Sequence, residues 1–234
     1  MPQSSLYVLP PPATPCLAID GSEQFFPVRR IYCVGRNYAE HAREMGADPS
    51  REAPFFFMKP GDAVVADGAR LAYPGQTQDL HYEAELVVAI GGSGENLSAE
   101  QAKALVFGYA VGLDMTRRDL QAQAKKGGTP WDMAKGFDRS APCSAIVPAA
   151  RIGHPSAGRI QLHQNGELRQ DADIADLIWS VPELLANLSS FVRLEPGDLV
   201  FTGTPAGVGP CVAGDALVAS VDGVGKVSVQ IVER

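Results

Sequence analysis

Two glutamates stand two residues apart in the middle of the chain, in the stretch HYEAELVVAI at positions 81–90. In a strand, Glu83 and Glu85 would point to the same face, about 7 Å apart, so their carboxylates repel unless a cation or a proton lies between them. A solvated outer face is the simpler interpretation of such a pair. However, residues 86–90 are apolar on both faces, which predicts a strand inside a sheet.

A third carboxylate, Asp114, ends another apolar run at residues 107–113. It could simply cap a turn, and spacing alone does not choose between a cap and a ligand. Three carboxylates at strand ends would suit a hard divalent ion, whereas zinc prefers histidine and cysteine. If all three side chains are ligands, the pattern suits Mg²⁺ (or Mn²⁺) as a cofactor, with Glu83, Glu85 and Asp114 as the candidate ligands.

His41 and Glu44 are three residues apart in a predicted short helix, 38–45, with Asn37 as its N-cap. They share a helix face and can hydrogen-bond, and a histidine oriented by a carboxylate can act as a general base for water. A surface ion pair of little energetic weight is the alternative. The following polar stretch, 47–51, is predicted to be mobile, and lids over active sites are built in this way.

An anionic substrate beside three carboxylates would need cations. The candidates are Lys59, Arg117, Arg118 and Lys135, and Lys135 stands out because it lies in an otherwise apolar stretch. A solvated side chain is the preferred interpretation of Arg117. The glycine-rich turn TGTPAGVGP, 202–210, matches no P-loop or GxGxxG spacing, but its backbone amides could hold a carboxylate.

The elements that must position these side chains are mostly strands. Strands are expected at 31–34, 55–58, 82–90, 199–202 and in 216–232, with turns at 59–81 and helices at 38–45, 98–106, 116–127 and 182–192. Asn165-Gly166 predicts a hairpin between 159–164 and 167–170. Together these elements predict an α+β fold that is mainly β.

Composition limits the function classes. The chain has 234 residues and a formal net charge of −7, so it lacks the basic footprint of a nucleic-acid-binding protein. Four scattered cysteines without a CxxC pair are expected to be buried thiols. We expect no membrane segment and no export signal, hence a cytoplasmic protein. The predicted organisation is a proline-rich surface extension, 1–28, with one strand near 16–19, followed by a catalytic domain, 29–234.

Seven stretches in one order resemble the fumarylacetoacetate hydrolase family. They are GRNYAEHAREM (35–45), PFFFMKP (54–60), LHYEAELVVAIG (80–91), GYAVGLDMTRRDLQ (108–121), PWDMAKGFDRSAP (130–142), NGELRQ (165–170) and EPGDLVFTGTPAGVGP (195–210). The likeness covers nearly the whole chain from Arg29 onward. It implies a rolled mixed β-sheet with short helices, and a homodimer.

Within this family the chain is most similar to the short acylpyruvate hydrolases. The resemblance implies that Glu83, Glu85 and Asp114 bind the metal. It also implies that His41 with Glu44 activates water. The substrate would be held by Lys135, Arg118, Gln121 and Thr204, with Lys59 nearby.

The implied substrate is a small β-diketo acid, and the implied reaction is hydrolysis of a C–C bond, with fumarylpyruvate giving fumarate and pyruvate. Oxaloacetate decarboxylation or a hydroxymuconate-type isomerisation at the same site remains an alternative. A non-catalytic binding protein on the same fold is a further alternative.

Overall fold

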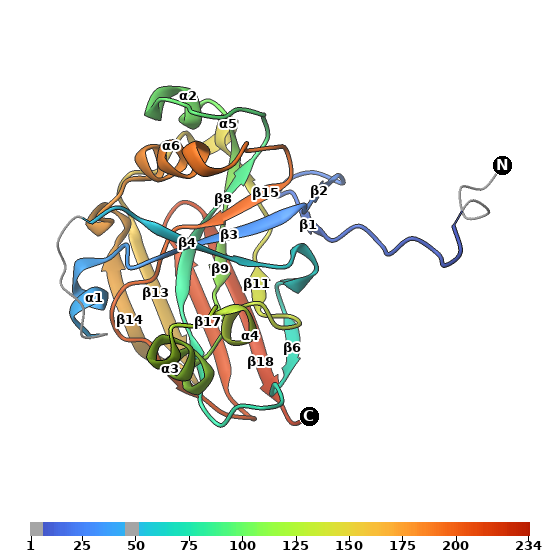
Figure 1. Cartoon of the computed structure of the whole chain (residues 1–234), viewed down its shortest axis with the longest axis vertical. Helices are drawn as coiled ribbons and strands as arrows, with labels where there is room; N and C mark the ends of the chain where they lie inside the picture. Colours follow the sequence, from blue (N-terminus) through green and yellow to red (C-terminus); the bar gives the residue numbers. More distant parts are fainter. Residues whose placement is uncertain (1–6, 45–51) are drawn as a thin grey trace.

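The largest element of the computed structural model, which describes residues 7–44 and 52–234, is a curled mixed sheet at the centre of the molecule (Figure 1). Its strand order is β4-β3-β15-β8-β9-β11-β5, and β12 also pairs with β9. The strands are β3 (Arg30–Gly35), β4 (Phe55–Lys59), β5 (Val64–Ala66), β8 (Ala84–Ile90), β9 (Val106–Leu113), β11 (Ala141–Cys143), β12 (Val147–Pro148) and β15 (Asp198–Phe201). The pairs β15/β3 and β11/β5 are parallel and the others antiparallel.

A second sheet, of order β14-β13-β17-β18-β6, packs against the first, and two small sheets complete the fold. The second sheet contains β6 (Ala69–Ala72), β13 (Arg159–Gln164), β14 (Glu167–Asp173), β17 (Ala216–Val221) and β18 (Gly225–Val232). The small sheets are formed by β1 (Cys16–Ala18) with β2 (Phe25–Pro27), and by β7 (Leu80–Tyr82), β10 (Thr116–Arg117) and β16 (Gly209–Cys211). The fold is therefore mainly β, as predicted.

The helices of the described chain are short. They are α1 (Ala39–Glu44), α2 (Ala99–Lys103), α3 (Arg118–Gly127), α4 (Asp132–Lys135), α5 (Ala149–Ile152) and α6 (Val181–Phe191), with 3-10 turns η2 (Gly61–Ala63) and η3 (Ile174–Asp176). Figure 1 shows α2, α5 and α6 gathered at one end, whereas α3 and α4 lie in front of the sheets. No helix within residues 7–44 and 52–234 is long and apolar enough to cross a membrane.

Strand β8 shows why the site has a rigid base. Leu86 and Val88 belong to the core cluster between the two large sheets, while Val87 and Ala89 belong to a second cluster on the opposite face. Every residue of β8 is buried. Such a strand is fixed from both sides, as its continuous apolar run predicted.

Several expectations about elements need correction. The helix predicted to reach residue 106 ends at Lys103, because Val106 begins the central strand β9. Helix α3 begins at Arg118 and not at Thr116, because Thr116 pairs with His81 in β10. The 59–81 segment contains strands β5 and β6 in addition to turns. The Asn165-Gly166 hairpin is confirmed, with both residues at positive φ.

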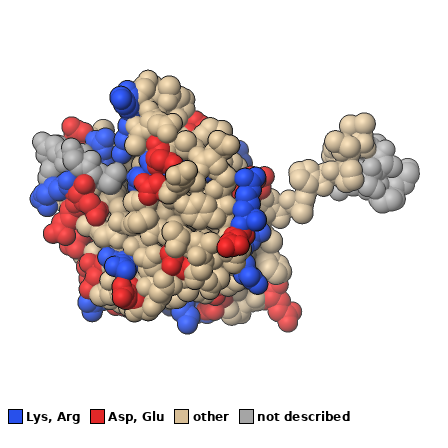
Figure 2. All heavy atoms as spheres, turned by 90° about the horizontal axis from the view of Figure 1, so that it is seen from below, with Lys and Arg blue, Asp and Glu red and all other residues tan. Residues whose placement is uncertain are grey.

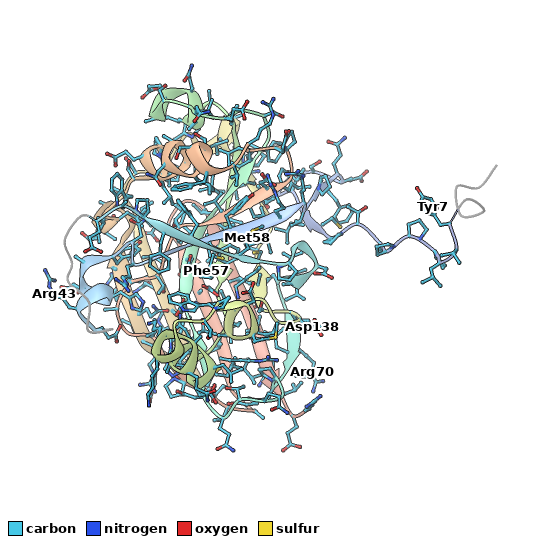
Figure 3. The ribbon with its side chains drawn as sticks, in the orientation of Figure 1. Tyr7, Arg43, Phe57, Met58, Arg70 and Asp138 are labelled. Atoms are coloured by element: carbon cyan, nitrogen blue, oxygen red, sulfur yellow. The ribbon has the colours of Figure 1, made fainter. Side chains whose placement is uncertain are left out.

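The N-terminal region is exposed in its first part and packed into the core in its second part. Residues 7–14 are exposed and project from the body, as Tyr7 does in Figure 3. By contrast, Leu17 and Phe26 of the β1/β2 hairpin are buried in the second core cluster, so this part does not merely lie on the surface. Cys16 is exposed, contrary to expectation, and the other three cysteines are buried. The domain boundary at residue 28 remains a prediction, and stretch 47–51 lies outside the described residues.

Candidate active site

The three acidic side chains lie close together, where strand β8 begins and strand β9 ends. Glu83 directly precedes β8, Glu85 lies in it, and Asp114 directly follows β9. Because β8 and β9 are antiparallel, with Ala84 opposite Leu113, the start of one strand lies beside the end of the other. One carboxylate oxygen from each acid lies within 4.8 Å of the others. All three side chains are buried, with exposed fractions of 0–5%.

The electrostatics of this cluster fit a divalent cation. Burial raises the pKa of Glu85 well above its usual range, and the nearby charges of Asp114 and Glu83 raise it further. Burial also opposes ionisation of Glu83, but Lys135 and Arg118 outweigh it and lower the pKa of that carboxyl. Carboxylates that repel one another in a buried site gain most from a cation between them, and an all-oxygen donor set suits Mg²⁺ or Mn²⁺.

Two buried lysines reach the carboxylates. The Lys135 ammonium donates to Glu83 Oε2 at 2.8 Å and to Asp114 Oδ2 at 2.7 Å, and these partners raise its pKa although burial opposes the charge. Lys59 Nζ is 2.8 Å from Asp114 Oδ1 and donates to the carbonyl oxygens of Met115 and Lys135. Lys135 lines the cavity, whereas Lys59 lies outside its lining. This placement favours a role for Lys59 in holding Asp114 over contact with substrate.

The first turn of α3 contributes one wall. Arg118 Nη2 donates to Glu83 Oε1 at 2.5 Å, and its Nη1 donates to Gln121 Oε1 at 2.6 Å, one helical turn further on. The backbone N–H of Arg118 donates to Asp79 O, which fixes the start of the helix to the segment before β7. Arg118 and Gln121 are thus held beside the acidic cluster.

Helix α1 places the His41–Glu44 pair at the same cavity. His41 Nδ1 is 3.1 Å from Glu44 Oε2, and His41 is 8% exposed. In Figure 3, Arg43 of the same helix points outward from the molecule. The Asn37 side chain, predicted to cap α1, anchors this connection by donating to Thr202 O and accepting from the Trp179 N–H.

The glycine-rich turn binds carboxylates of the protein itself. The Gly203 N–H donates to Glu85 Oε2 at 2.7 Å, and the Gly207 N–H donates to Glu44 at 3.2 Å. The carboxylate-binding chemistry expected from the sequence is therefore present, but these two amides are occupied by internal partners. The turn therefore links the acidic cluster to helix α1.

A buried glutamine supports this turn. Gln170, which is 0% exposed, donates through Nε2 to Thr204 Oγ1 at 2.8 Å and to Pro205 O at 2.9 Å. Its Oε1 accepts from the Ala84 N–H, between the two glutamates, at 3.0 Å. Sequence reasoning did not identify Gln170 as a site residue, although NGELRQ was among the matching stretches.

One cavity of about 150 Å³ unites these groups. Of the residues predicted for the site, it is lined by His41, Glu83, Glu85, Arg118, Gln121, Lys135 and Thr204. Glu44 and Asp114 contact lining residues. The lining residues that sequence reasoning missed are Val34, Gly35, Arg36, Phe55, Phe57, Lys125 and Trp131. A signal existed for several of them, since the stretches GRNY, PFFF and PWDM contain them.

The fold and the buried carboxylate cluster define a class of metal-binding enzyme, and comparison with known proteins names it. A family model described as fumarylacetoacetate (FAA) hydrolase C-terminal matches residues 30–232. The chain therefore belongs to the fumarylacetoacetate hydrolase family.

Three relatives show how specific the likeness is. A fumarylpyruvate hydrolase of Ralstonia sp. is 46% identical over 184 residues, which cover 79% of this chain and 95% of that protein. The mitochondrial oxaloacetate tautomerase FAHD1 of Mus musculus is 44% identical over 196 residues, covering 84% and 88%. A crystal structure of fumarylpyruvate hydrolase from Pseudomonas aeruginosa in complex with Mn²⁺ and pyruvate is 55% identical, with a TM-score of 0.96, and covers 97% of this chain and 100% of that one.

Proposed function

We propose that this enzyme hydrolyses the C3–C4 bond of an acylpyruvate, with fumarylpyruvate as the preferred substrate and fumarate and pyruvate as products. The observation that carries the proposal is one cavity in which three buried carboxylates, a buried lysine and a histidine–glutamate pair converge. The similarity to fumarylpyruvate hydrolases, one of them with Mn²⁺ and pyruvate, supports the same reaction.

The acidic cluster would hold the cofactor and the adjoining wall the 2-oxo acid. Glu83, Glu85 and Asp114 would bind Mg²⁺ or Mn²⁺, which supplies Lewis-acid stabilisation of negative charge on the substrate. Arg118 and Gln121 would hold the substrate carboxylate through charged and neutral hydrogen bonds.

His41 would act as the general base. A hydrogen bond from Nδ1–H to Glu44 selects the tautomer in which Nε2 carries the free lone pair, and that nitrogen would remove a proton from water. The oxygen of this water adds to C4, the C3–C4 bond breaks, and its electron pair remains on C3, which gains a proton to complete pyruvate. The Lys135 ammonium at the cavity floor would oppose the negative charge that develops during this step.

Oxaloacetate tautomerisation is a second candidate. The relative from Mus musculus supports it, and the reaction needs only the same 2-oxo acid site and a proton carrier such as His41. Oxaloacetate decarboxylation and hydroxymuconate-type isomerisation would also use this site. Oxaloacetate cannot undergo the hydrolytic step itself, because its C4 is already a carboxylate and offers water no electrophile, so its conversion would report one of these other reactions.

A direct comparison of substrates tests the proposal. Pyruvate release from fumarylpyruvate and from acetylpyruvate is measured with coupled lactate dehydrogenase in Mg²⁺, and conversion of oxaloacetate is followed by its ultraviolet absorbance and by coupled pyruvate detection. We expect kcat/KM to be highest for fumarylpyruvate and at least about tenfold lower for acetylpyruvate. Faster conversion of oxaloacetate than of either acylpyruvate would contradict the hydrolase assignment and support a reaction of oxaloacetate in its place.

A further inference from the structure

Two cations at the cavity have no role in the reaction described above. Arg36, which follows β3, and Lys125, in the last turn of α3, both line the cavity and are solvent-exposed. Among the residues that the structure describes, no carboxylate forms an ion pair with either of them. By contrast, Arg118 and Lys135 are already paired with Glu83. Within the described part of the chain, Arg36 and Lys125 thus have no carboxylate partner and can receive an anion.

Each of the two cations lies on one of two aromatic rings that contact each other. The Arg36 guanidinium carbon lies 5.4 Å from the centroid of the Phe55 ring, and Lys125 Nζ lies 5.3 Å from the centroid of the Trp131 ring. These two rings contact each other edge to face, at 5.3 Å and 86°. Cation–π contacts at these distances restrain long, exposed side chains. The rings thus form one frame that carries both charges at the cavity.

Backbone conformation and electrostatics agree with this arrangement. Arg36 adopts φ of +61°, a left-handed conformation that is uncommon outside glycine, asparagine and aspartate and that often marks a functional site. The pKa of Lys125 is lowered first by burial and then by Arg118 and Arg36. The positive charges are thus near enough to repel one another, and an anion between them would relieve the repulsion.

The other cations considered from the sequence do not offer this surface. Arg117 packs its guanidinium on the Phe137 ring, 4.5 Å from the centroid, and donates to Met133 O. Lys59 is held by Asp114 and two backbone carbonyls. Neither side chain lines the cavity. Arg36 and Lys125 therefore remain as the cations that face it with a free charge.

We propose that Arg36 and Lys125 form a second carboxylate site, which makes the enzyme selective for 2-oxo acids that carry another carboxylate at their far end. The acidic cluster and Arg118 would take the 2-oxo end, and the aromatic frame and its cations would take the distal carboxylate. This inference rests on the proposed function for the orientation of the substrate. It specifies the substrate class as dicarboxylic.

The test uses ligands that cannot be hydrolysed, so that it does not depend on turnover. 2-Oxoheptanedioate and 2-oxoheptanoate have the seven-carbon chain of fumarylpyruvate, lack its C4 oxo group, and differ from each other in the distal carboxylate alone. Their dissociation constants are measured by titration calorimetry in Mg²⁺ for the wild type, Arg36→Gln and Lys125→Gln. The matched controls are Arg139→Gln, which also has φ of +61° but lies outside the cavity lining, and Lys126→Gln, an exposed neighbour of Lys125.

We expect the wild type and both controls to bind the dioate at least about tenfold more tightly than the monoacid, as one charged hydrogen bond provides. Arg36→Gln and Lys125→Gln should each reduce that ratio severalfold. Equal binding of the two ligands by the wild type would overturn the inference, even if acylpyruvates are hydrolysed. Preference for the dioate without hydrolysis of any acylpyruvate would instead remove the proposed function and leave the second carboxylate site standing.

Discussion

The cavity has charged side chains in two regions, a buried floor around the acidic cluster and an exposed mouth around Arg36 and Lys125. The two regions differ in solvent exposure and in the partners of their charges. On the floor, Glu83, Glu85, Asp114 and Lys135 are at most 5% exposed; Lys135 donates to Glu83 and Asp114, and Glu85 accepts from the Gly203 N–H. At the mouth, Arg36 and Lys125 are exposed and rest on aromatic rings. A buried charge is tolerated only when it is paired, whereas an exposed charge keeps most of its hydration.

This difference predicts a division of labour. The floor is attached to β8 and β9, which are buried on both faces, so it can hold a fixed set of metal ligands. The mouth is formed by a residue after β3 and by the end of a short helix, so its side chains can be exchanged with little effect on the core. We therefore expect floor substitutions to abolish the reaction and mouth substitutions to change only which substrate reacts.

The largest effect is expected at the floor. Glu85→Ala removes one of the three proposed ligands and the acceptor of the Gly203 N–H, so hydrolysis should fall to background, and Mn²⁺ should no longer raise the thermal midpoint. EDTA should do the same to the wild type, with recovery on adding Mg²⁺. Glu100→Ala, at an exposed position on α2, serves as the control. Full activity of Glu85→Ala or of the EDTA-treated enzyme would exclude a catalytic metal there.

The next largest effect is expected in helix α1, at the proposed general base. His41→Ala should lower kcat by about 10²- to 10⁴-fold through loss of the general base, with little change in the free energy of unfolding. Glu44→Ala and the double variant should lower kcat by similar factors, because the effects of substituting residues that act as a unit are not additive. Steady-state kinetics measure kcat, and urea denaturation measures the free energy of unfolding. His163→Ala on β13 is the control. Small additive effects would identify a surface ion pair instead.

A smaller effect is expected at Gln170, which lies outside the cavity lining but joins Thr204 to the backbone between the two glutamates. Gln170→Leu should weaken Mn²⁺ binding and lower kcat/KM by about 10- to 100-fold, as loss of an outer-shell partner does. It should also lower the free energy of unfolding by about 1 to 3 kcal/mol, because buried groups lose their partners. Calorimetry and denaturation measure these changes, and Gln161→Leu on the neighbouring strand is the control. Unaltered Mn²⁺ affinity would mean that Gln170 contributes only to the stability of the fold.

The floor was easier to predict from sequence than the mouth, for a physical reason. Glu83, Glu85 and Asp114 adjoin long apolar runs, and a carboxylate beside a buried strand is conspicuous because burial is costly. The His41–Glu44 pair has helical spacing that can be counted directly. In both cases local sequence contains the signal.

Arg36, Lys125 and Gln170 have no such burial or spacing signal, although Arg36 and Gln170 lie in stretches that match the family. Each is a polar residue in a turn, a helix end or a strand, and its importance arises from contacts with other elements of the fold, such as Arg36 with Phe55 and Gln170 with Thr204. Strand β6 was missed for a similar reason, because its parallel pairing with β18 spans most of the chain. Likewise, the resemblance predicted Lys59 to lie near the substrate. The ion pair between Lys59 and Asp114 is visible only in the tertiary structure.

The smallest effect concerns pH and sharpens the contrast between mouth and floor. Burial, then Arg118 and Arg36, lower the pKa of Lys125 from its ordinary value of 10.5; Glu83 opposes this shift and Lys135 adds to it. A lowered pKa means that the ammonium loses its proton at a lower pH than a free lysine does. The preference for 2-oxoheptanedioate over 2-oxoheptanoate should therefore decline a fewfold as the pH rises through the lowered pKa.

Lys125→Arg provides the decisive comparison, because a guanidinium stays charged throughout that range. The ratio of the two dissociation constants, measured by calorimetry in Mg²⁺ at several pH values, should stay level in Lys125→Arg and decline in the wild type and in Lys126→Arg. The floor contributes equally to both ligands, so changes in its protonation cancel in the ratio. A parallel decline in Lys125→Arg would show that Lys125 does not contact the distal carboxylate and would leave Arg36 as its only partner.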